Sequence, residues 1–172
     1  MKNFILAGGI ILAVVLMGFI VGCGDEDDNG DIPDGIHFTA DGTAYSITED
    51  VYAWFESGDP DGTIRFSATS GESFPQSWAT IWDQRTGNYT EQEADMGIQL
   101  DSDGDWYYVG YPIAKKSPKI TPWGSLSLTV LEADEDGRIV GRFSGTFQSE
   151  DKNNEIEITS GSFSLEAGDP PF

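Results

Sequence analysis

The chain offers a single histidine, His37, as a candidate base for nucleophilic catalysis. A serine or cysteine nucleophile normally needs a histidine to take its proton, and no G-x-S-x-G elbow occurs in the sequence. His37 stands at the start of an expected strand, where an ordinary hydrogen bond is the simpler role. Zinc is disfavoured for a related reason, because its sites draw mainly on histidine and cysteine.

Calcium is a better metal candidate because it needs only oxygen ligands. Aspartate-rich turns recur along the chain, and the best set of ligands is Asp101, Asp103 and Asp105. Each such turn is also an ordinary hairpin tip, so both interpretations stay open. No other cofactor is indicated.

Paired carboxylates could support glycoside hydrolysis, which needs an acid and a second carboxylate at a defined separation. The chain has 30 acidic residues, and the sequence gives no separation between any two of them. A glycan-directed hydrolase therefore stays an alternative without a named catalytic residue.

Aromatic side chains are the more informative set. If residues 105–111 form a strand, Trp106 and Tyr108 face one way while Tyr107, Val109 and Tyr111 face the other. Only one of these faces can join the core of a two-layer fold, so the other presents rings to solvent, to the segment 112–123 or to a ligand. Flat rings beside hydrogen-bonding groups suit sugar or peptide binding. The candidate ligand-binding residues are Trp78, Trp82, Trp106 and Tyr108.

The first 22 residues have the layout of a signal peptide, with an apolar run over Phe4–Val21. A run of about 20 apolar residues could also span a bilayer. It ends in Ile20-Val21-Gly22-Cys23, and Cys23 is the sole cysteine of the chain. This ending resembles the lipobox of bacterial lipoproteins, which implies cleavage before Cys23 and acylation of that residue. The alternatives are an uncleaved N-terminal anchor and an ordinary secretory signal peptide followed by an unmodified cysteine.

Residues 23–35 are rich in acidic residues and glycine, which predicts a flexible tether. The formal net charge of −21 disfavours nucleic acid as a partner. Acidic residues after a lipidated cysteine resemble the signal that exports some lipoproteins across the outer membrane, and Gly24 differs from the aspartate of inner-membrane retention signals. The resemblance implies an outer-membrane lipid anchor, with the domain facing the periplasm or the cell surface.

Residues 36–172 read as one antiparallel β-domain of short β-prone stretches separated by turn residues. Asp41-Gly42 is a strong hairpin signal between the first two stretches. Within 155–166 the apolar positions change from even (Ile156 and Ile158) to odd (Phe163), which indicates a bulge at Ser160-Gly161. About ten such strands predict a β-sandwich or a barrel without separating the two.

The two ends of this β-domain resemble a group of uncharacterised small lipoproteins from the Bacteroidetes and related bacteria. The opening residues fit F-x-A-x-G-x-x-Y, and the segments 141–146 and 158–163 fit G-x-F-S-G-T and I-T-x-G-x-F. The resemblance covers most of the β-domain. It implies a sandwich-like or barrel-like fold and assigns no catalytic residue.

The sequence therefore predicts a membrane-anchored lipoprotein of the envelope that is a non-catalytic binding or structural module. Its expected partners are the membrane, through the lipid, and a glycan or an envelope protein. Besides the hydrolase, a further alternative is an assembly subunit that pairs through an edge strand.

Overall fold

A computed structural model describes residues 31–56, 62–68, 74–101, 104–111, 121–135 and 137–169. These residues belong to one compact unit, Asp31–Phe172. They form the strands β1 (Gly35–Ala40), β2 (Thr43–Ile47), β3 (Val51–Glu56), β4 (Thr63–Ala68), β5 (Gln76–Ile81), β6 (Gly87–Thr90), β7 (Ala94–Gln99), β8 (Trp106–Val109), β9 (Ser125–Ala133), β10 (Arg138–Ser149) and β11 (Glu155–Glu166). No helix in the described part of the chain is long and apolar enough to cross a membrane.

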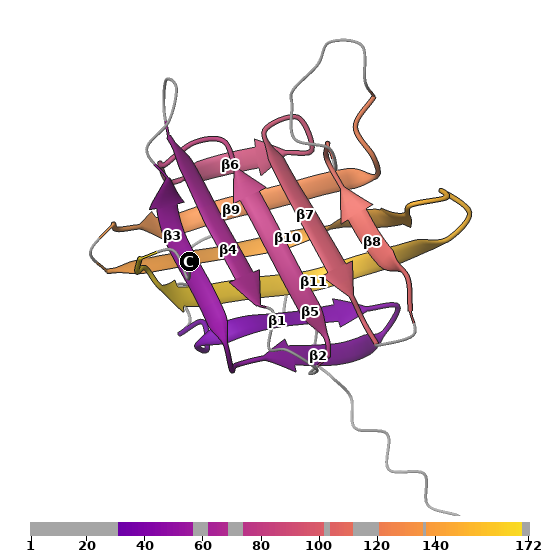
Figure 1. Cartoon of the computed structure of the whole chain (residues 1–172), viewed down its shortest axis with the longest axis horizontal. Helices are drawn as coiled ribbons and strands as arrows, with labels where there is room; N and C mark the ends of the chain where they lie inside the picture. The colour runs from indigo at the N-terminus through magenta and orange to yellow at the C-terminus, as the bar shows by residue number, and fades with distance from the viewer. Residues whose placement is uncertain are drawn as a thin grey trace, which may run out of the picture. The chain divides into compact units, whose positions relative to one another are not determined.

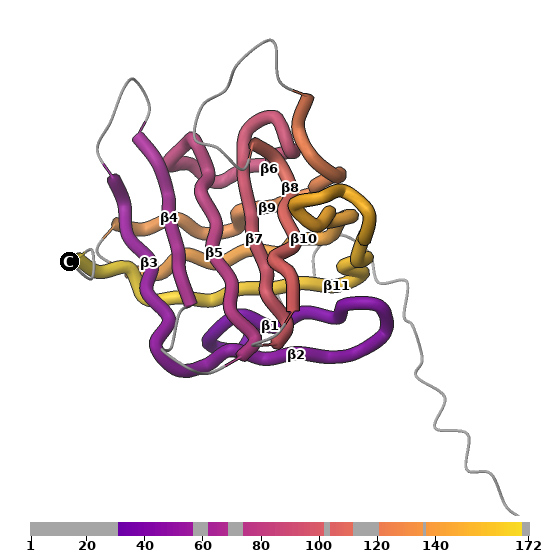
Figure 2. Tube along the Cα trace, turned by 45° about the vertical axis from the view of Figure 1, so that its right-hand side comes forward, coloured from indigo at the N-terminus to yellow at the C-terminus, as the bar shows by residue number. Residues whose placement is uncertain are grey.

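The strands form two layers that cross each other steeply (Figure 1). The front layer has the order β3-β4-β5-β7-β8, and the back layer has the order β2-β1-β11-β10-β9-β6. Strand β10 links the layers, because its first part pairs with β9 while Gln148 and Ser149 pair with β8. On the opposite side, the Gly168 N–H donates to the Ala53 carbonyl oxygen at 2.9 Å. The all-β prediction is confirmed, and the eleven antiparallel strands make a nearly closed barrel (Figure 2).

The first hairpin follows directly from its turn residues. Asp41 and Gly42 have φ values of 47° and 81°, the pair of positive values that a two-residue type I′ turn requires. The turn pairs Ala40 with Thr43 and, four residues back along β1, Ile36 with Ile47. The hairpin predicted at Asp41-Gly42 is confirmed.

Alternating side chains from both layers fill the barrel. Ile64, Phe66 and Ala68 of β4 are buried, as the alternation in that segment predicts. The ring of Phe66 packs against Phe163 from the back layer, with 5.1 Å between the ring centroids. Contacts of this kind bury apolar area between the layers and hold them together.

The predicted change of register in β11 is confirmed, although the irregularity lies slightly earlier than expected. Thr39 pairs with Ser160 and Ala40 pairs with Ile158, so β11 carries an extra residue at Thr159. This extra residue keeps both Ile158 and Phe163 inside the barrel.

Two features differ from the sequence-based expectation. Strand β6 was not predicted, because GNYT is short and holds one large apolar residue, Tyr89, which is buried. Asp34, expected in the flexible tether, instead forms an ion pair with Arg138 at 2.6 Å. The ordered structure therefore extends before residue 36.

Candidate ligand-binding surface

Two strands of the front layer, β5 and β8, direct aromatic side chains out of the barrel on either side of β7. In β5, β7 and β8 the alternate residues, including Ala79, Met96 and Val109, are buried in the core. The residues between them therefore point outward. Trp78 of β5 pairs with Gly97 of β7, which pairs in turn with Tyr108 of β8.

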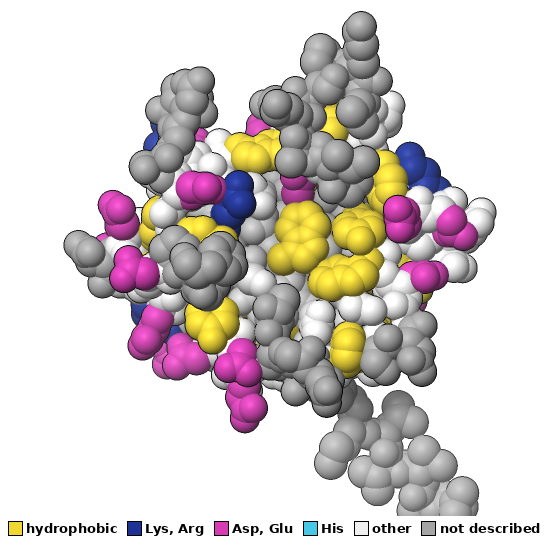
Figure 3. Space-filling view, viewed as in Figure 1, with side chains coloured by type: hydrophobic (Ala, Val, Ile, Leu, Met, Phe, Trp, Pro, Cys, Tyr) yellow, Lys and Arg dark blue, Asp and Glu magenta, His cyan; other side chains and the backbone are white. Residues whose placement is uncertain are grey.

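Three of these outward rings and the ring of Trp123, which precedes β9, form one cluster, which we call the aromatic surface: Trp78, Trp106, Tyr108 and Trp123. Tyr108 lies at its centre, with ring centroids 6.3 Å from Trp78, 6.2 Å from Trp106 and 5.8 Å from Trp123. Each ring is half-buried. Figure 3 shows hydrophobic side chains gathered near the middle of this face, with acidic side chains around them.

Gly97 gives Trp78 its place on the sheet. A Cβ atom at residue 97 would lie 2.3 Å from Nε1 of Trp78, so the indole rests directly over the glycine. This contact holds the indole close to the sheet and leaves part of the ring exposed.

The aromatic surface has a charged margin. Nζ of Lys152 lies 4.7 Å from the ring centroid of Trp123, a cation–π distance. The pKa of Tyr108 is raised, mainly by burial and also by the negative charge of Glu150. Rings and hydrogen-bonding groups therefore lie close together on this face.

Trp82 lies apart from the aromatic surface and pairs with Tyr111. Their ring centroids are 6.0 Å apart, and the Tyr111 hydroxyl donates to Oε1 of Gln92 at 2.9 Å. The alternation of 105–111 predicted Tyr111 on the same face as Val109. That prediction is wrong, because Gly110 has a φ of 89° and interrupts the strand geometry between the two residues.

The sequence did not single out Asp95, which the structure places on the outer side of β7. Its side chain is nevertheless only 4 % exposed. The carboxylate accepts a hydrogen bond from the Tyr111 backbone N–H. Burial raises the pKa of Asp95 to about 7, against the opposing effect of this hydrogen bond. Strand alternation could have placed Asp95 outward, but its burial depends on residues after β8.

The calcium candidates occupy the turn between β7 and β8. The Gly104 N–H donates to the Asp101 carbonyl oxygen at 3.3 Å, and Nε2 of Gln99 donates to the Gly104 carbonyl oxygen at 2.9 Å. Asp103 lies outside the described residues, so the structure does not place the full set with Asp105. Elsewhere within the described ranges, no group of three or more histidine, cysteine or acidic residues could hold a metal ion.

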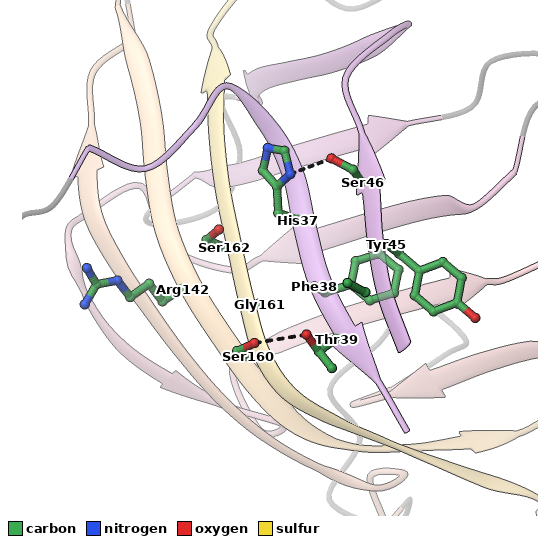
Figure 4. Close-up of a pocket in the computed structure, with 10 residues that line it drawn as sticks. His37, Phe38, Thr39, Tyr45, Ser46, Arg142, Ser160, Gly161 and Ser162 are labelled. Atoms are coloured by element: carbon green, nitrogen blue, oxygen red, sulfur yellow. Dashed lines mark hydrogen bonds between the residues drawn. The ribbon is translucent and has the colours of Figure 1, made fainter. Parts of the chain in front are cut away.

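The outer side of the back layer carries a groove of about 530 Å³. Figure 4 shows hydroxyl groups along it, including those of Thr39 and Ser160, which hydrogen-bond at 3.3 Å. His37 also lines it. Its Nε2 donates to the Asp34 carbonyl oxygen at 2.9 Å, and its Nδ1 accepts from the Ser46 hydroxyl at 2.6 Å.

The hydrogen bonds of His37 match the structural role predicted for it. The carbonyl oxygen of Asp34 can only accept, so Nε2 carries the proton and Nδ1 is left as the acceptor. The contact between His37 and Ser46 could have been predicted from the sequence, because a two-residue turn at 41–42 pairs residue 37 with residue 46. Cys23 lies outside the described residues, so its predicted lipidation stays a prediction.

A scan against protein-family models and searches of curated proteins and of solved structures found no match to this chain.

Proposed function

We propose that this protein is a non-catalytic envelope lipoprotein that binds a glycan on the aromatic surface. The observation that carries the proposal is the contact of Tyr108 with the rings of Trp78, Trp106 and Trp123 on the outer side of the front layer. In the proposed arrangement, lipid on Cys23 anchors the barrel to the outer membrane. The residues between Cys23 and Asp34 serve as its tether.

The chemistry of the surface favours a sugar. The apolar faces of sugar rings pack on aromatic rings, while nearby polar groups hydrogen-bond their hydroxyls. The rings already contact one another, so binding needs little ordering of side chains and little affinity is lost to it. A net charge of −21 repels polyanions, which favours a neutral glycan.

Asp95 bears on the alternative of a glycan-directed hydrolase. Such an enzyme needs a carboxyl group with a raised pKa that reaches the bond to be cleaved. Asp95 has the raised pKa, but it is only 4 % exposed and accepts a hydrogen bond from Tyr111. A carboxylate so enclosed supports the local structure, and this favours binding over hydrolysis.

Affinity electrophoresis tests the glycan proposal, with the detergent-solubilised lipoprotein run through gels that contain neutral or acidic polysaccharides. We expect retardation by a neutral polysaccharide that is lost in Trp106→Ala and kept in Tyr52→Ala. Tyr52 is the matched control because it is an aromatic residue of the front layer, 42 % exposed and outside the aromatic surface. Equal loss in both variants, or retardation by acidic polysaccharides alone, would contradict the proposal.

Metabolic labelling with a palmitate analogue tests the anchor. We expect label on the natural chain and none on Cys23→Ser. Protease treatment of whole cells then separates the two orientations, since only a surface-exposed barrel is digested. An unlabelled natural chain would disprove the lipid anchor while leaving the glycan proposal open.

A further inference from the structure

A pocket of about 370 Å³ lies beside Trp82, at the end of β5. Its other lining residues include Asp83 before β6, Asn88 within β6 and Glu93 after it. Here we call it the Trp82 pocket. It combines one large ring with several hydrogen-bonding groups in a small concave space, as sites for small polar ligands do.

Local hydrogen bonds hold the pocket in shape. The guanidinium of Arg85 donates two hydrogen bonds to the Asp83 carboxylate, from Nε to Oδ1 at 2.9 Å and from a terminal nitrogen to Oδ2 at 2.7 Å. The Tyr89 hydroxyl donates to the Arg85 carbonyl oxygen at 2.7 Å. The backbone N–H of Trp82 donates to the Glu93 carbonyl oxygen at 3.0 Å. A site that is already ordered loses little conformational entropy when a ligand binds.

The polar groups suit a ligand that carries hydroxyls. The hydrogen bond from Arg85 lowers the pKa of Asp83, so this carboxylate stays ionised and can accept hydrogen bonds from hydroxyl groups. Oδ1 of Asn88 accepts from the Thr129 hydroxyl at 2.8 Å, which fixes the orientation of the amide whose nitrogen is a donor. An acceptor, a donor and an aromatic face together match one neutral sugar ring.

The pocket also lies in line with the aromatic surface. The hydrogen bond from Trp82 to Glu93 continues the pairing of β5 with β7 for one residue beyond β5. Trp78 and Trp82 are four residues apart, so strand alternation places both side chains on the outer side of the sheet. At about 3.3 Å per residue, they lie about 13 Å apart. A glycan chain that crosses the aromatic surface along β5 therefore reaches the pocket.

We infer that the Trp82 pocket binds the terminal sugar of a neutral glycan whose following sugars lie on the aromatic surface. This inference rests on the proposed function and adds a second contact, which selects the end of a chain. Trp82 stacks on the sugar ring, Asp83 accepts from its hydroxyls and the amide of Asn88 donates to them. Carboxylate groups at the pocket disfavour an acidic sugar.

The test uses single sugars, which can fill the pocket without the aromatic surface. The full lipoprotein in detergent micelles, with its five tryptophans labelled with 15N, is titrated with glucose, galactose, mannose or xylose. Trp82→Phe assigns the Trp82 indole signal. We expect at least one neutral sugar to shift this signal and leave that of Trp106 unchanged, and we expect Asn88→Ala to weaken binding about tenfold.

The possible outcomes separate this inference from the proposed function. If a neutral polysaccharide binds the aromatic surface but no single sugar shifts the Trp82 signal, the inference is wrong and the proposed function stands. A larger shift with glucuronate than with any of the four neutral sugars would disprove the selection of neutral sugars. If neither polysaccharides nor single sugars bind, both proposals fail. A well-dispersed spectrum for Asn88→Ala shows that this variant is folded.

Discussion

The outer faces of the two layers differ in chemistry, although the inner faces of both layers pack into one apolar core. Along the groove of the back layer, the outer residues carry hydroxyl groups, the imidazole of His37 and the guanidinium of Arg142 (Figure 4). In the front layer, the outer residues include Trp78, Trp106 and Tyr108. Core packing requires neither set, because strand alternation directs both away from the barrel interior.

The difference indicates which of the two outer faces binds a ligand. Polar groups at outer strand positions are expected of any strand face that lies in water. The outer face of the back layer therefore gives no evidence of a ligand. Half-buried rings at equivalent positions of the front layer leave apolar area in water, and a ligand or a covering segment offsets that cost. The contrast between the two faces is therefore the basis for placing a ligand on the front one.

The largest expected effect comes from removing two rings of the aromatic surface. Trp106→Ala combined with Tyr108→Ala should weaken binding of the neutral polysaccharide about 100-fold, since buried aromatic residues dominate most binding sites. Isothermal titration measures the loss. Thr39→Ala combined with Ser160→Ala removes two outer side chains of the back layer and should leave the affinity unchanged. An equal loss from both pairs would remove the distinction between the faces.

A smaller effect is expected from filling the space under Trp78. Gly97→Val places a side chain where the indole rests, so the ring must move and the packing is strained. We expect the free energy of unfolding to fall by about 1–3 kcal/mol and the polysaccharide to bind more weakly. Denaturant unfolding measures the first change. Gly168→Ala is the control, because a Cβ atom there meets nothing within 4 Å. Unchanged stability in Gly97→Val would show that Trp78 does not depend on the glycine.

Asp95 gives the front layer a dependence on pH. Its pKa is about 7 in the folded protein against 3.8 as the ordinary value, so between these pH values the folded state holds a proton that the unfolded state has lost. Stability from this group is therefore present at low pH and declines as the pH rises to about 7. Asp95→Asn cannot titrate, yet its amide oxygen can still accept from Tyr111.

Relative to the natural protein, Asp95→Asn should therefore gain stability between pH 4 and pH 8, by up to about 4 kcal/mol at about 1.4 kcal/mol for each unit of pKa difference. Chemical denaturation at the two pH values measures the difference, and other carboxylates cancel in the comparison. A constant difference at both pH values would show that Asp95 ionises in the folded protein as it does in water.

The sequence predicted the parts of the fold that depend on local rules. Alternation identified the buried face of β4, and Asp41-Gly42 predicted the first hairpin with its register. It also placed Trp106 and Tyr108 on one face, where the structure finds their rings nearly parallel at 17°. Each of these features depends on residues close together in the chain.

The sequence failed where distant segments meet. The contact of Trp123 with Tyr108 depends on how the chain returns after β8, and alternation cannot predict that. The burial of Asp95 has the same origin, because Tyr111 follows a glycine with positive φ. The Trp82 pocket needs β6, whose four residues carry too weak a pattern to be recognised as a strand.

The smallest expected effect concerns His37 on the back layer. Ser46→Ala removes the hydrogen bond to Nδ1 at 2.6 Å. Because Ser46 is exposed, water can replace the lost donor, and we expect a loss of about 0.5 kcal/mol of stability with no change in glycan affinity. The imidazole should keep its proton on Nε2, since the Asp34 carbonyl oxygen still accepts from that atom. Nitrogen NMR shifts of the imidazole report the tautomer. A shift of the proton to Nδ1 would show that Ser46 determines the tautomer of His37. Weaker glycan binding would show that the back layer contributes to the binding of the glycan.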